Sequence, residues 1–199
     1  MIPPIGMWYI RIIILLIIIQ LFYVRESRAE DEQRWILSGY GSIPTQMIGI
    51  SVYGINTLKI GYYGTLAITV NQPYYDDPNL YNMSINKAEN IFGDTLLESN
   101  DKWQSFFVGI TQKIYKLNFI YGGIGFSNKD VFRKYDDEYE ILGNQGHYWI
   151  KDSDASIRYA PGIQLGLLHI MPTGWCIGGG FQTTPQGVHI IVGKKMTGP

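Results

Sequence analysis

The chain has 199 residues, of which 46% are hydrophobic and 17% are charged, and its formal net charge is −1. The lack of a basic excess argues against nucleic acid as a partner, and the single cysteine excludes an intramolecular disulfide. The length suits one domain with a closed core or a closed barrel, and a second domain is not expected.

Residues 1–29 contain the three parts of a secretory signal peptide. Arg11 supplies positive charge, residues 12–19 are all Ile or Leu, and Ser27-Arg28-Ala29 provides small residues ahead of an acidic stretch. We predict cleavage after Ala29, which leaves residues 30–199 with thirteen Lys and Arg, sixteen Asp and Glu and a formal charge of −3. The alternative is an uncleaved anchor, because residues 5–24 approach the length of about 20 residues that spans a bilayer.

The rest of the chain repeats one kind of strand, in which aliphatic residues alternate with Gly, Ser, Thr, Tyr or Gln. Successive side chains of a strand point to opposite faces, so each segment has one aliphatic face and one small or polar face. A face turned to water usually carries Lys and Glu, whereas Gly, Ser, Thr and Tyr suit a narrow polar interior. Alternation and turn residues place eight segments near residues 35–43, 46–55, 57–70, 103–113, 115–127, 157–170, 174–184 and 187–195. We predict an all-β fold, an antiparallel up-and-down β-barrel of about eight strands.

The two faces of these segments predict which side chains meet lipid and which line the lumen. The predicted lipid-facing residues are Ile48, Ile50, Val52, Leu58, Ile60, Leu66, Ile68, Val188, Ile190 and Val192. The predicted lumen-facing residues are Lys59, Tyr63, Thr65, Gln182 and His189. Aromatic residues near the proposed strand ends are expected at the membrane interface, namely Trp35, Trp103, Tyr115, Tyr159 and Trp175.

The predicted connections fall into a short class and a long class. Tight turns are expected around Asn56, around Lys113 and Ile114, and at residues 171–174, whereas long polar loops are expected near residues 71–102 and 128–156. In a meander both long loops lie at the end opposite these turns. Outer-membrane barrels have the same asymmetry, with short periplasmic turns and longer external loops.

Both long loops show signs of local structure. In the first, residues 86–97 predict a short helix with Ala88, Ile91 and Phe92 on one side. In the second, Asn144-Gln145-Gly146 predicts a hairpin turn between residues 139–143 and 147–151. These residues either extend the two neighbouring barrel strands, near residues 115–127 and 157–170, beyond the membrane, or enter the wall as a hairpin that raises the strand number to ten.

Several stretches together resemble a known family. They are Phe107-Val108-Gly109-Ile110-Thr111, Tyr121-Gly122-Gly123-Ile124-Gly125-Phe126, His147-Tyr148-Trp149-Ile150-Lys151 and the closing strand at residues 187–193. Over most of residues 35–195 the chain resembles small Gram-negative outer-membrane β-barrel proteins of the OmpA and OmpX type. The resemblance implies a bacterial outer-membrane location, with outer-membrane lipid and the barrel assembly machinery as partners. The chain departs from the pattern at residues 194–199, which include no terminal aromatic residue.

No catalytic, cofactor-binding or metal-ligating residues are predicted. Ser105, Ser127 and Ser156 do not lie in the Gly-x-Ser-x-Gly setting of a nucleophile, and no His lies in a local motif with a Ser and an acidic residue. Cys176 and His189 could meet on adjacent strands, but two ligands are too few for zinc.

The sequence therefore predicts a monomeric outer-membrane protein with a structural, adhesive or surface-recognition role, no catalysis and a loop partner that it does not identify. Three alternatives stay open. The first is a secreted soluble β-barrel or sandwich whose aliphatic faces turn inward around an apolar ligand. The second is an outer-membrane barrel enzyme that acts on lipids, and the third is an inner-membrane anchored protein with a periplasmic β domain.

Overall fold

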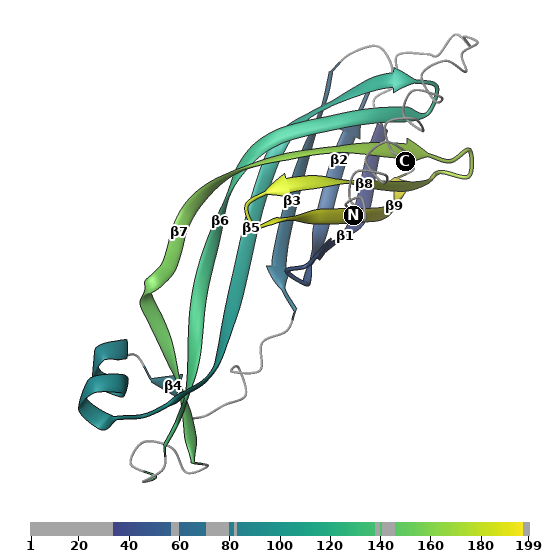
Figure 1. Cartoon of the computed structure of the whole chain (residues 1–199). Helices are drawn as coiled ribbons and strands as arrows, with labels where there is room; N and C mark the ends of the chain where they lie inside the picture. Colours follow the sequence, from purple (N-terminus) through teal and green to yellow (C-terminus); the bar gives the residue numbers. More distant parts are fainter. Residues whose placement is uncertain are drawn as a thin grey trace, which may run out of the picture.

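The computed structural model describes residues 34–56, 60–70, 80–81, 83–137, 140 and 146–196. Within these ranges the chain is mostly β-strand, and eight strands close into a ring (Figure 1). The predicted signal peptide with Ala29, and the two predicted wall residues Leu58 and Lys59, lie outside the described residues.

The strands of the ring are antiparallel and follow one another around it in chain order. They are β1 (Arg34–Ile43), β2 (Met47–Ile55), β3 (Gly61–Thr69), β5 (Leu96–Tyr115), β6 (Asn118–Asp136), β7 (His147–Ile170), β8 (Trp175–Thr183) and β9 (Gln186–Met196). The ring closes where β9 pairs with β1, from Trp35 opposite Met196 to Ile43 opposite Val188. This arrangement confirms the predicted all-β, antiparallel up-and-down fold.

The number of strands in the ring is eight rather than ten. Residues 147–151 form the beginning of β7, which continues from His147 to Ile170 beside β6, so they extend a barrel strand as the first of the two predicted alternatives requires. Asn144 and Gln145 of the predicted turn lie outside the described residues. The short strand β4 (Leu80–Tyr81) pairs in parallel with β7 next to Trp149 and Ile150, outside the ring.

The two ends of the ring differ as predicted. One end, called the terminal rim here, holds the beginning of β1, the end of β9 and the connections β2–β3, β5–β6 and β7–β8. The long connections, from β3 to β5 and from β6 to β7, lie at the opposite, distal end. One turn lies later than predicted, at Lys116 and Leu117 instead of Lys113 and Ile114. The pairing of β5 with β6 shifts between Lys113 and Tyr115, and Lys116 adopts the left-handed turn conformation with φ 44°.

The predicted loops at residues 71–102 and 128–156 are wrong in part, because strands run through the end of the first and through most of the second. β5, β6 and β7 continue past the ring as a three-stranded extension, which comprises residues 96–103, 128–136 and 147–158 (Figure 1). Polar residues there still pair across strands. Lys129 lies 2.8 Å from Asp101, and Lys151 lies 2.9 Å from Asp130, so opposite charges stabilise the sheet where it leaves the aliphatic wall.

The predicted helix is shorter than expected and has a different buried side. Helix η1 (Lys87–Phe92) ends at Gly93, which adopts the left-handed conformation with φ 75°, and Leu96 and Leu97 belong to β5. Ala88 is fully buried, whereas Ile91 is 71% exposed. The helix lies at the far end of the extension (Figure 1), where Ala88 packs with Tyr135, Tyr148 and Ile150.

Interior glycines allow aromatic rings to lie against the wall of the ring. A Cβ atom at Gly166 would come within 2.4 Å of Cζ of Tyr121, and one at Gly125 would come within 2.7 Å of Cδ1 of Phe107. A larger residue at either position would displace a ring. This is the physical reason for glycine inside strands that otherwise favour branched or aromatic residues.

Candidate functional site: the outer belt and the filled interior

The outer surface of the ring is a continuous belt of exposed aliphatic and aromatic side chains. Of the predicted lipid-facing residues that the structure describes, eight are 50–58% exposed and Val52 is half-buried. The belt continues on the other strands, and its remaining members, again exposed, include Leu37, Val108, Ile110, Ile120, Ile124, Ile163, Leu165, Leu167, Ile177 and Phe181. We call this surface the outer belt. Monomeric soluble proteins rarely expose an apolar patch that encircles the molecule.

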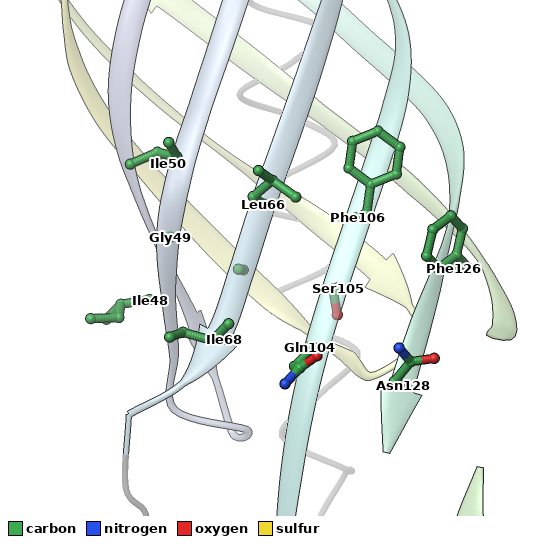
Figure 2. Close-up of a pocket in the computed structure, with 11 residues that line it drawn as sticks. Ile48, Gly49, Ile50, Leu66, Ile68, Gln104, Ser105, Phe106, Phe126 and Asn128 are labelled. Atoms are coloured by element: carbon green, nitrogen blue, oxygen red, sulfur yellow. The ribbon is translucent and has the colours of Figure 1, made fainter. Parts of the chain in front are cut away.

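Rows of side chains cross the outer belt from strand to strand. Strand pairing places Ile50, Leu66, Phe106 and Phe126 in one row across β2, β3, β5 and β6. Figure 2 shows this row beside the next one, in which Gln104 and Asn128 follow Ile48 and Ile68. The space between the rows is a groove of about 580 Å³. Amide groups appear in the second row, so it marks the distal border of the belt on these strands.

The predicted lumen-facing residues that the structure describes lie inside the ring and are buried. Tyr63 is 4% exposed, Thr65 is 1% exposed, and Gln182 and His189 are 0% exposed. The aliphatic faces therefore point outward and the polar faces inward. A soluble barrel around an apolar ligand requires the reverse orientation.

Hydrogen bonds link the polar side chains of the interior. The Ser51 and Thr65 hydroxyl oxygens are 2.8 Å apart, and the Tyr121 hydroxyl is hydrogen-bonded to Nε2 of His189. The Tyr40 hydroxyl donates to Oε1 of Gln182. Side chains thus fill the interior, as expected for a ring of about eight strands.

Three tyrosines form the centre of this interior. The ring centroids of Tyr53, Tyr63 and Tyr121 are 5.2–5.4 Å apart, within the range of favourable aromatic pairs. The Tyr53 and Tyr63 hydroxyls are fully buried and have no hydrogen-bond partner among the described residues. Each such hydroxyl costs about 1–3 kcal/mol of desolvation that no hydrogen bond offsets.

The predicted interfacial aromatics occupy different environments. Trp35 and Trp175 are 46% and 49% exposed at the terminal rim, and Tyr115 ends β5 at the same rim. Tyr159 is 69% exposed at the distal border, where its backbone N–H donates to Oδ1 of Asn128. Trp103 differs, because its indole is half-buried against the interior cluster and its backbone N–H donates to the Thr69 hydroxyl.

A second polar cluster lies in the extension, and the sequence patterns did not predict it. The Tyr135 hydroxyl donates to Oε1 of Glu89 at 2.9 Å, and the Tyr148 hydroxyl donates to Oδ2 of Asp94 at 2.5 Å. Burial, together with Glu89, raises the pKa of Tyr135 to about 12. Burial and Asp94 raise the pKa of Tyr148 in the same direction. Both tyrosines thus hold helix η1 and its flanking residue on the extension.

The described side chains that could act as metal ligands or nucleophiles do not come together in one site. Cys176 and His189 are both buried inside the ring, yet the described residues contain no group of three or more His, Cys, Asp or Glu side chains that could hold a metal ion. The Ser105 hydroxyl lies 2.8 Å from the Ser127 hydroxyl, and the Ser156 hydroxyl donates to the backbone oxygen of Asp152. The lack of catalysis stays a prediction.

Comparison with known proteins adds no relative: no family model matches the chain, and no curated protein matches it in sequence. In the part of the chain that the structure describes, no helix has the length and apolar character needed to cross a bilayer.

Proposed function

We propose that this chain is an outer-membrane β-barrel protein with a structural, adhesive or surface-recognition role. The outer belt carries this proposal. It surrounds the ring with half-exposed Ile, Leu, Val and Phe side chains, and lipid is the solvent in which such a surface is favourable.

Closure of the ring also supports a location in a membrane. A bilayer offers no hydrogen-bond partners to backbone groups, so a sheet can span it only if it has no open edge. The pairing of β9 with β1 removes that edge within one chain, which also supports a monomer. Burial of Ser51, Tyr53, Tyr121, Gln182 and His189 at 0% exposure favours a structural wall over a wide diffusion channel.

The lengths of the connections support one orientation of the barrel in the membrane. We place the terminal rim, with its short turns, on the periplasmic side and the extension outside the cell. Recognition or adhesion would then belong to the extension, which carries helix η1, β4 and many of the charged side chains. A signal peptide at residues 1–29 and insertion by the barrel assembly machinery are parts of this proposal.

The test uses the native protein from isolated cell envelopes. It should partition into the detergent-extracted fraction, and its unboiled band should migrate differently from its boiled band on gel electrophoresis, because a closed barrel resists unfolding by the gel detergent. Recovery as a soluble protein without a band shift would overturn the proposal and favour the secreted soluble alternative.

A further inference from the structure

The charges of this protein are segregated along the axis of the ring. All acidic residues that the structure describes belong to the extension or the connections beyond it, and they are Glu89, Asp94, Glu98, Asp101, Asp130, Asp136, Asp137, Glu140, Asp152 and Asp154. The described cations of the terminal rim are Arg34, Lys113, Lys116, Lys194 and Lys195. The described charges of the terminal rim are therefore all basic, whereas the acidic residues 30–32, which precede β1 in the sequence, lie outside the described residues.

Two of these lysines combine positive charge with an exposed position beside an aromatic ring. Lys194 follows Val192 on the outer face of β9, and its Nζ lies 5.8 Å from the ring centroid of Trp175. Lys116 lies in the β5–β6 turn, and its Nζ is 5.2 Å from the ring centroid of Tyr115. Both lysines are exposed.

The surroundings indicate what these lysine–aromatic pairs meet. They lie where the outer belt ends: Ile177 continues the belt from Trp175, and Ile114 is exposed beside Tyr115. Aromatic side chains at such a border prefer the headgroup region of a bilayer. A lysine that extends from there reaches the phosphate level and keeps its charge hydrated.

We propose that the terminal rim binds the anionic phospholipid headgroups of the leaflet that surrounds it, through Lys116 and Lys194. This inference rests on the proposed membrane location and adds a lipid preference at one end of the ring. Both lysines are exposed beside an aromatic ring at the edge of the outer belt, so their charges can reach lipid phosphates. Each lysine near an anionic lipid surface strengthens the affinity of the protein for that surface by about fivefold.

The experiment uses the full mature protein, folded in a non-ionic detergent. Equal amounts of a phosphatidylglycerol and a phosphatidylcholine with the same acyl chains are added, and native mass spectrometry measures the ratio in which the two lipids bind. Wild type should favour phosphatidylglycerol. The variant Lys116→Gln/Lys194→Gln should lose about fivefold of that preference for each lysine.

A matched control is present in helix η1. The Nζ atom of exposed Lys87 lies 5.6 Å from the ring centroid of Phe92, but this lysine–aromatic pair is in the extension, away from the belt. Lys87→Gln should keep the wild-type lipid ratio. The single variants Lys116→Gln and Lys194→Gln provide the same measurement if the double variant does not fold.

The two proposals fail in different ways. Equal binding of both lipids by a heat-modifiable wild-type protein, or an equal loss of preference in Lys87→Gln, would overturn the lipid preference alone. A soluble protein without a band shift would instead overturn the membrane proposal from which the preference follows.

Discussion

Tyr63 of β3 lies directly against Gly109 of β5, so that a Cβ atom at Gly109 would come within 2.6 Å of Cε1 of the tyrosine. The same Cβ would lie 2.5 Å from Cα of Gly123 on β6. Two glycines on paired strands thus form the surface on which one buried aromatic ring rests. The absence of side chains at Gly109 and Gly123 therefore leaves the space that the Tyr63 ring occupies.

This contact predicts that Gly109→Ala destabilises the ring by about 1–3 kcal/mol, because the new methyl group meets backbone atoms that have little room to move. Urea unfolding of the detergent-folded protein measures the effect. Gly64→Ala is the control, since its Cβ would find its nearest neighbour at 3.9 Å, and it should change the free energy of unfolding by less than about 0.5 kcal/mol. Equal effects of the two substitutions would contradict the packing argument.

A charged side chain on the outer belt should destabilise the membrane-inserted protein by an amount that depends on its depth in the bilayer. Ile124 lies halfway between Ile120 and the border residue Asn128 on the outer face of β6, whereas Ile60 immediately precedes β3 at the terminal rim. We expect Ile124→Lys to destabilise the membrane-inserted protein by about 2–4 kcal/mol and Ile60→Lys by about 0–1 kcal/mol. Equilibrium unfolding in phospholipid vesicles gives both values. Water around the belt would instead make both substitutions nearly neutral.

The unpartnered hydroxyl of Tyr53 predicts that a more apolar side chain stabilises the interior. Tyr53→Phe removes a buried group without a hydrogen-bond partner and should raise the free energy of unfolding by about 1 kcal/mol. Tyr121→Phe, by contrast, deprives His189 of its hydrogen bond and should lower it by about 1–3 kcal/mol. The two variants differ from wild type by one oxygen atom each, and urea unfolding should separate them in sign.

The folded extension should lose stability at high pH. The pKa of Tyr135 is about 12 in the folded protein and 10.0 without the fold, so the unfolded form loses its proton first as pH rises. Stability that depends on the protonated tyrosine is complete below pH 10 and declines between about pH 10 and 12. Absorbance at 295 nm, compared between wild type and Tyr135→Phe, should assign a transition near pH 12 to this residue. A transition near pH 10 would contradict the buried contact with Glu89.

Replacement of Glu89 tests the cause of the raised pKa of Tyr135. Because Glu89 raises the pKa of Tyr135, Glu89→Gln should move the same absorbance transition to lower pH. Glu98→Gln is a suitable control, since Glu98 is exposed on β5 and is not among the groups that shift this tyrosine.

The sequence by itself determined the direction of the wall side chains that the structure describes, and the order of the strands. The alternation of Leu66 and Ile68 with Thr65 and Ala67 is a local property, because the two-residue period of a strand requires no knowledge of its partner. The placement of both long connections at one end also followed from counting strands, since each strand of a meander reverses direction.

Only the tertiary structure decided where the strands end and what fills the ring. β5, β6 and β7 extend beyond the belt because they pair with one another, and charged stretches such as residues 128–136 give no aliphatic alternation by which to recognise a strand. The contact between Tyr63 and Gly109, and the contact between Tyr135 and Glu89, each join residues more than forty positions apart. Such contacts depend on strand register and on ring closure, which arise from pairing between distant segments rather than from the pattern of any one of them.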